Sequence, residues 1–134
     1  MIPFRLTFAP GISLYEQVVY AAKKAIIAGQ LRPGDPFPSV RLLSRALKIN
    51  PNTAHKVVTE LVAEGLLEVR VGAGTVVAKR SASTASDRAN LLNKELEQLV
   101  VEAKRLGLDI DAVQSALARH WARLNTERLE DKKS

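Results

Sequence analysis

The hydrophobic and polar positions of the first thirty residues follow the period of an α-helix. Apolar side chains recur every three or four residues over 14–28, so that one face of this segment is apolar. Ser13 and Glu16 have the spacing of a capping box, which satisfies the free amide groups of a first turn. Gly29 can adopt the left-handed conformation that ends a helix. The pattern predicts a helix over residues 14–28.

Two further helices are predicted after a segment that is rich in proline. Residues 31–38 contain three prolines and a glycine, which exclude a helix and leave room for at most a very short strand. Ser39 then caps a short helix that ends near Lys48, and Asn50 caps a longer helix that continues to Gly65. A short helix, a tight turn and a longer helix form the layout of a helix-turn-helix.

The pattern changes to alternation after the third helix. Residues 66–71 alternate apolar and charged side chains in their second half, and residues 75–79 are rich in β-branched side chains. Gly72, Ala73 and Gly74 between them allow a tight reversal. We interpret these residues as a β-hairpin, which in this position would be the wing of a winged helix-turn-helix.

The remainder of the chain returns to helical spacing after a segment without periodicity. Two apolar stripes are separated by Gly107, and Asp109 can cap the second helix. The side chains that we expect at a dimer interface are Leu92, Leu96, Leu99, Leu106, Val113, Leu117, Trp121 and Leu124. Because two helices cannot bury both stripes against each other, a second copy of the chain is expected to cover them. We favour a core role for Trp121 over a ligand-stacking role.

The expected fold is mainly α with a small β-hairpin. It comprises a winged helix-turn-helix DNA-binding domain over residues 1–80, a linker over 81–86 and a helical hairpin dimerisation domain over 87–134.

The distribution of charge points to a polyanionic partner of the first domain. The net charge of the 134 residues is +6. Residues 1–80 carry 11 Lys and Arg against 5 Asp and Glu, whereas residues 81–134 carry nine of each. The segment from Ser39 to Lys56 holds four cations and no acid, as expected of a surface that contacts phosphate. A solvated face is the alternative, and only the three-dimensional context can decide between them.

Several other classes of function find no support in the sequence. The chain has no cysteine, and its two histidines lie 65 positions apart, which is not the spacing of a metal site. No arrangement of Ser, His and acid and no phosphate-cradling loop is present, so we expect neither an enzyme nor a cofactor. No apolar run reaches the roughly 18 residues that span a bilayer, and the first residues lack the apolar core of a signal peptide. We therefore expect a cytoplasmic protein without membrane contact.

The residues quoted so far, taken as a set, resemble those of the GntR family of bacterial repressors. The resemblance extends over nearly the whole chain, and the short tail resembles the YtrA-like subfamily. It rests on Ser13–Val18, Ile27–Arg41, Asn50–Thr53, Leu61–Leu66, Gly72–Thr75 and Glu102–Leu108.

The resemblance implies which residues approach DNA. They are Ser39, Arg41, Arg45, Asn52, Thr53, His55, Lys56, Gly72, Ala73 and Gly74. Members of the family often carry arginine where this chain has Pro51 and His55, so base recognition here uses fewer guanidinium groups. The operator sequence of a relative is therefore not a basis for predicting the operator of this chain.

The individual side chains have competing interpretations. We expect Arg41 to contact a base, or a base and a phosphate, rather than to form a surface ion pair, because a guanidinium can bind guanine O6 and N7 together. Lys56 is expected to bind phosphate. Arg45 either contacts DNA or pairs with acids of its own domain, Thr53 either faces the groove or caps its helix, and His55 either contacts a base edge or is solvated.

The sequence as a whole predicts a sequence-specific transcriptional repressor that binds a palindromic operator as a homodimer. A small-molecule effector, if one exists, is expected between subunits or between wing and tail, because the tail is too small for a deep pocket. The rival interpretation is a winged-helix protein-interaction module, which would present an apolar surface. RNA binding would require exposed aromatic side chains on the contact face.

Overall fold

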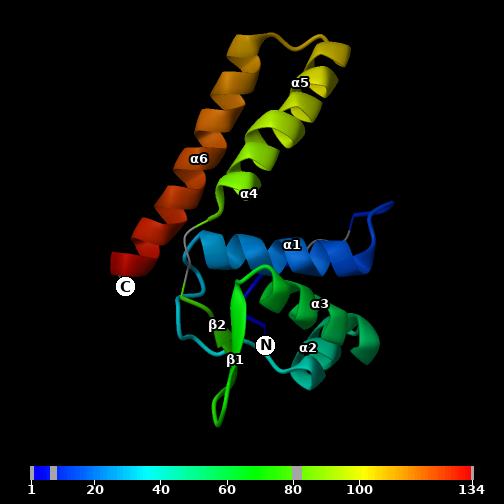
Figure 1. Cartoon of the computed structure of the whole chain (residues 1–134), viewed down its shortest axis with the longest axis vertical. Helices are drawn as coiled ribbons and strands as arrows, with labels where there is room; N and C mark the ends of the chain where they lie inside the picture. The colour runs from blue at the N-terminus through cyan, green and yellow to red at the C-terminus, as the bar shows by residue number, and fades with distance from the viewer. Residues whose placement is uncertain (1, 7–8, 80–82, 134) are drawn as a thin grey trace. The chain divides into compact units, whose positions relative to one another are not determined.

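The computed structural model describes residues 2–6, 9–79 and 83–133. The chain divides into two compact units, one containing residues 1–80 and the other containing residues 81–126 (Figure 1). The fold is mainly helical, with a two-stranded hairpin after a helix-turn-helix and further helices towards the C-terminus, which confirms the predicted fold class. None of the helices in the described ranges is both long and apolar enough to span a bilayer.

The first unit contains three helices that begin and end close to the predicted positions. They are α1 (Leu14–Ile27), α2 (Val40–Leu47) and α3 (Pro51–Ala63). Side-chain oxygens of Ser13 and Ser39 each accept a backbone N–H of the first turn at 3.1 Å, and the Asn50 carboxamide oxygen accepts another at 2.7 Å. Because these caps satisfy amides that the helix leaves free, each helix starts where its cap residue stands.

The hairpin consists of β1 (Leu67–Arg70) and β2 (Gly74–Val77), which pair antiparallel with Leu67 opposite Val77. The proline-rich segment before α2 runs along β2: the N–H of Phe37 donates to the Thr75 carbonyl at 2.9 Å, and Pro36 forms an isolated bridge with Val76. The predicted very short strand is therefore present as this bridge. It attaches the wing to the start of α2.

The core of the first unit joins the three helices to the hairpin. Each helix contributes at least one fully buried side chain to this core: Val18 from α1, Leu43 from α2 and Val57 from α3. The N-terminal segment also contributes to this core, because the ring of Phe4 stacks on that of Phe37 with 6.1 Å between centroids and 12° between planes. The contribution of Phe4 was not predicted, since a lone aromatic residue in an irregular segment has no periodic signal.

The second unit differs from its prediction at its start. Helix α4 (Ala85–Asn90) begins inside the predicted linker, and continues through a π-helical turn, η1 (Leu91–Glu95), into α5 (Leu96–Arg105). The Thr84 hydroxyl accepts the N–H of Asp87 at 3.0 Å and so caps α4. The prediction of a linker over 81–86 did not take this cap into account. Residues 81 and 82 of that linker lie outside the described residues.

The break between the last two helices is confirmed. Gly107 has a φ of 77°, which ends α5, and an Asp109 carboxylate oxygen accepts the N–H of Ala112 at 2.9 Å. Helix α6 (Ile110–Lys133) follows. Among the described residues of this unit only Ala103 is buried, so most of the apolar side chains remain exposed.

We expect Phe4→Ala to destabilise the first unit by about 3 kcal/mol, because it removes a buried ring and leaves a cavity beside Phe37. Urea unfolding followed by circular dichroism measures the change. Val71→Ala is the control, because this side chain is fully exposed and its truncation should leave the midpoint unchanged. An equal effect of the two substitutions would show that Phe4 does not stabilise the core.

Candidate nucleic-acid interface

Four cations of the helix-turn-helix are exposed to solvent. We call Arg41, Arg45, Lys48 and Lys56 the basic ridge. Lys48 ends α2 in the left-handed conformation with a φ of 55°, which positions it between the two helices. Among the residues that the structure describes, no carboxylate forms an ion pair with any member of the ridge. The alternative that Arg45 pairs with acids of its own domain is therefore not observed here.

The exposed side of α3 is polar in its first turns, whereas Val62 near its end is an exposed apolar residue. Asn52, His55 and Lys56 are exposed, whereas Ala54, Val57 and Leu61 on the other side are buried. Thr53 is half-buried, and the helix cap is made by Asn50 rather than by Thr53. The first turns of α3 therefore present a polar surface rather than the apolar one of a protein-interaction module, and residues 39–79 contain no Phe, Tyr or Trp for stacking on RNA.

The wing presents backbone and small side chains at its tip. Gly72 and Gly74 have φ angles of 83° and 78°, the left-handed region in which glycine is favoured. The nearest cation, Arg70, bonds to Glu68 through Nε at 2.9 Å and Nη2 at 2.6 Å. The Arg70 charge is therefore compensated within the wing.

Helix α1 binds the two acids near the C-terminal end of α3. The Tyr15 hydroxyl donates to Oε1 of Glu60 at 3.4 Å, and Nζ of Lys23 lies 2.5 Å from Oε1 of Glu64. Partial burial and the Glu60 charge raise the pKa of Tyr15, so its hydroxyl remains a donor. Glu60 lies one turn after Lys56, where a helical ion pair could form, yet none is present between them.

This role of α1 has no signal in the local sequence pattern. The spacing of Lys56 and Glu60 was visible along the chain, but the partners Tyr15 and Lys23 come from a helix some forty residues earlier. Only the packing of α1 on α3 brings them together.

A helix-turn-helix with an unpaired cationic ridge, a polar third helix and a hairpin attached directly after it defines the winged-helix class of DNA-binding proteins. Comparison with known proteins assigns the family within that class. Residues 14–77 match the model of the family "Bacterial regulatory proteins, gntR family". These residues extend from the start of α1 to the end of β2.

A similar sequence supports this assignment, and two solved structures share the fold. The HTH-type transcriptional repressor YtrA of Bacillus subtilis (strain 168) is 32% identical over 99 residues, which cover 73% of this chain and 76% of YtrA. A transcriptional antiterminator from Listeria monocytogenes EGD-e has a similar structure, with a TM-score of 0.80, 23% identity and coverage of 90% of this chain and 91% of that one. YtrA from Sulfolobus acidocaldarius has a TM-score of 0.53 and 24% identity, covering 90% of this chain and 98% of its own.

The chain belongs to the GntR family and is YtrA-like. It is a DNA-binding transcription regulator of the winged helix-turn-helix type and not an enzyme. The predicted family is thereby confirmed, whereas the individual contact residues remain predictions. Within the described residues, no group of three or more His, Cys, Asp and Glu could hold a metal ion.

We expect Tyr15→Phe to weaken DNA binding about twofold, because the released Glu60 carboxylate can then pair with Lys56. The dependence of log K on log salt should also become shallower, by less than the roughly 0.9 that loss of a whole phosphate contact would give. Fluorescence anisotropy with DNA from the protein's own upstream region, measured over a series of salt concentrations, gives both values.

The matched variant is Tyr15→Phe combined with Glu60→Gln, which removes the competing carboxylate and should restore wild-type affinity. If the double variant binds as weakly as Tyr15→Phe alone, Tyr15 does not act through Glu60.

Proposed function

We propose that the protein is a homodimeric repressor that binds a palindromic operator. The observation that carries the proposal is the basic ridge, four exposed cations without carboxylate partners among the described residues. Repression needs no further chemistry, because a protein that occupies a promoter excludes the polymerase. The similar Bacillus protein YtrA bears the name of a repressor. A regulator of this kind acts in the compartment that holds the DNA, which supports a cytoplasmic location.

In the proposed complex α3 lies in the major groove of DNA. Asn52 and His55 on its exposed face reach base edges, and Lys56 binds a phosphate as a point charge. Arg41, at the first turn of α2, supplies a guanidinium that can bind guanine O6 and N7 together. Arg45 and Lys48 contribute phosphate contacts. The Ser39 hydroxyl oxygen accepts the N–H of Leu42 as the helix cap, so its proton is available to a phosphate oxygen.

The proposed role of the wing differs from that of the ridge. Because Arg70 is paired with Glu68, the tip at Gly72, Ala73 and Gly74 has no free charge to offer. The Ala73 N–H already donates to the Arg70 carbonyl at 3.1 Å, so it is the small size of these three residues that suits close approach to the sugar-phosphate backbone or to a minor groove. The wing should therefore add contact area and orientation, with little effect on salt dependence.

The exposed apolar face of the second unit supports a dimer. Leu92, Leu96 and Leu99 on one helix and Leu117 and Trp121 on the other are all exposed, with 68% of Trp121 accessible. Leu106 is exposed as well, whereas Val113 and Leu124 are half-buried. A soluble protein rarely leaves so large an apolar patch uncovered. A second copy of the same helices offers a matching apolar face, as in helical bundles.

Two α3 helices related by the dimer axis then enter successive major grooves. The half-sites should lie about 34 Å apart, one helical turn of DNA, or a multiple of this distance. An operator with the same symmetry as the protein, that is, an inverted repeat, follows from the geometry.

The test of the proposal is a salt titration of binding to DNA from the protein's own upstream region. Wild-type protein should bind an inverted repeat there, with affinity that falls steeply as salt rises. Arg41→Ala should cost about 1–3 kcal/mol if Arg41 contacts a base, and the loss should be greatest on the preferred sequence. Lys94→Ala in the second unit is the control and should leave affinity unchanged. Absence of salt-dependent binding to any such fragment would refute DNA recognition through the ridge.

Dimerisation is tested by Trp121→Ala. We expect this change to shift the monomer–dimer equilibrium towards the monomer by about 2 kcal/mol or more, because a large aromatic side chain at an interface is a common hot spot. Sedimentation equilibrium measures the association constant. Tyr20→Ala on α1 is a matched control, since Tyr20 has nearly the same accessibility, 66%. A stable dimer in the Trp121 variant, or a monomeric wild type, contradicts the proposed interface.

A further inference from the structure

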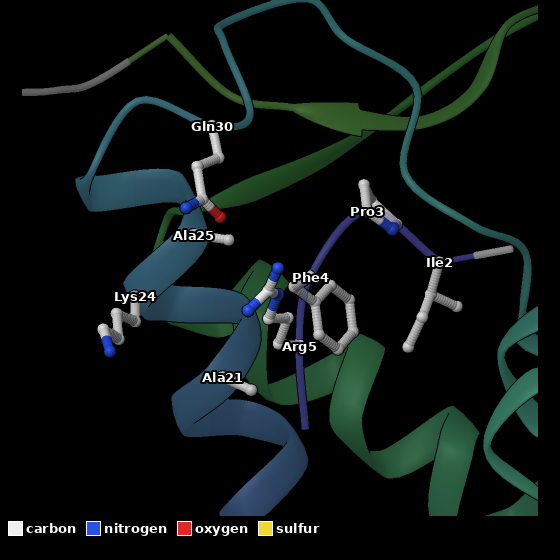
Figure 2. A pocket seen from close by; sticks show the side chains of 8 residues that line it. All are labelled: Ile2, Pro3, Phe4, Arg5, Ala21, Lys24, Ala25 and Gln30. Atoms are coloured by element: carbon white, nitrogen blue, oxygen red, sulfur yellow. The ribbon is translucent and has the colours of Figure 1, made fainter. Parts of the chain in front are cut away.

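A cleft in the first unit lies away from the basic ridge and plays no part in the proposed DNA complex. It has a volume of about 820 Å³ and is bounded by the N-terminal segment on one side and by α1 and Gln30 on the other (Figure 2). This volume falls in the range of pockets that hold small molecules, roughly 300–1,000 Å³. The lining residues determine which class of ligand fits this cleft.

The polar groups of the cleft favour an anion. Arg5 from the N-terminal segment and Lys24 from α1 bring positive charge to it, and no acid is among its described lining residues. Figure 2 shows the Arg5 and Gln30 side chains directed towards Ala25, with Lys24 at the edge. None of the described carboxylates forms an ion pair with Arg5 or Lys24. Arg5 is therefore the cation that faces the cleft, and the Lys24 ammonium, which Figure 2 shows directed away from Arg5, adds positive charge at its edge. An anion bound beside Arg5 would supply a partner for the guanidinium charge.

The C-terminal end of α1 does not cancel this preference. A helix C-terminus carries a partial charge of roughly −0.5, much smaller than the two full positive charges of the side chains. The last carbonyls of α1 are also satisfied by the following backbone: the N–H groups of Ala28 and Gln30 donate to the carbonyls of Lys24 and Ala25 at 2.9 and 3.0 Å. Neither cation is therefore needed to cap the helix.

The remaining lining of the cleft is apolar. Ile2 and Phe4 contribute from the N-terminal segment, and Ala21 and Ala25 from α1. Phe4 and Ala25 are almost fully buried, so the apolar surface open to a ligand comes mainly from the half-buried Ile2 and Ala21. This surface is small and suits a short hydrocarbon or aromatic part. An inorganic ion would use the charges but not this surface.

Phe4 connects the cleft to the DNA-binding elements. It lines the cleft and stacks on Phe37, whose N–H is bonded to Thr75 of the wing. Phe37 also stands two residues before Ser39, the cap of α2. A ligand that holds the N-terminal segment against α1 would thus stabilise the positions of the wing and of the start of α2.

We propose that this cleft binds a small organic carboxylate with an apolar part, and that its occupancy raises the affinity for DNA. The site lies within one unit of one subunit, in contrast to the intersubunit or wing–tail location expected from the sequence. The regulatory half of the proposal rests on the proposed function, whereas the binding half does not.

Binding is tested without DNA on the full-length protein by titration of its amide NMR resonances. The probes are phenylacetate and hexanoate, their neutral amides, and inorganic phosphate. We expect saturable shifts at Arg5, Ala25 and Gln30 with the carboxylates, binding about tenfold weaker for the neutral amides, and weaker binding of phosphate. Equal binding of acid and amide, or no saturable shift in the cleft with either carboxylate, overturns the site.

Variants locate the site. Arg5→Gln and Lys24→Gln should each weaken carboxylate binding about tenfold, whereas Lys94→Gln in the second unit should have no effect. The same spectra show that each variant is folded. Carboxylate shifts that persist unchanged in both cleft variants would place binding elsewhere, for example on the exposed apolar helices, and would refute the proposal.

The regulatory half is tested by DNA affinity at saturating carboxylate. We expect an increase of about fivefold in the wild type and none in Arg5→Gln. Unchanged affinity with an occupied cleft refutes regulation but leaves the site intact. If the cleft binds carboxylate and the protein binds no DNA at all, the proposed function fails independently of the cleft.

Discussion

The packing of α3 on α1 is the constraint from which the DNA-binding surface follows. One side of α3 is buried through Ala54, Val57 and Leu61. The opposite side of the helix is therefore exposed to solvent. The same contact places Tyr15 and Lys23 beside Glu60 and Glu64. A helix with positive charge early and negative charge late would ordinarily compensate part of its own charge. Here α1 binds the negative charge, so the cationic residues remain available to a polyanion.

The wing and the N-terminal segment depend on a second set of contacts. The segment before α2 is bonded to β2 at both Asp35 and Phe37, so that the wing cannot move without affecting the start of α2. Phe4 closes this assembly by stacking on Phe37. The hairpin is too short to be stable alone, and these contacts supply the packing that it lacks. They also form the path by which occupancy of the proposed N-terminal site would affect the elements that we propose to contact DNA.

The two units use apolar surface in opposite ways. The first unit buries its apolar face within itself, around Val18, Leu43 and Val57. The second unit keeps most of its leucines and Trp121 exposed, and Ala103 is the one buried residue among those described there. Helices with such a face gain most of their stability from packing rather than from propensity. The stability of the second unit is therefore expected to depend on protein concentration.

The sequence by itself determined the local architecture. Ser13, Ser39 and Asn50 each cap a helix by accepting a backbone N–H two or three residues later. The change from helical spacing to alternation marks the hairpin. Because both signals are local, the helix-turn-helix and the wing could be predicted. The cations of the basic ridge were also predictable, because the segment from Ser39 to Lys56 holds four cations and no acid. Only the tertiary structure decided that Tyr15 and Lys23 hold the acids of α3, and that Phe4 reaches Phe37. These contacts join residues about thirty to forty-five positions apart, and their formation depends on how helices pack, which no local pattern encodes.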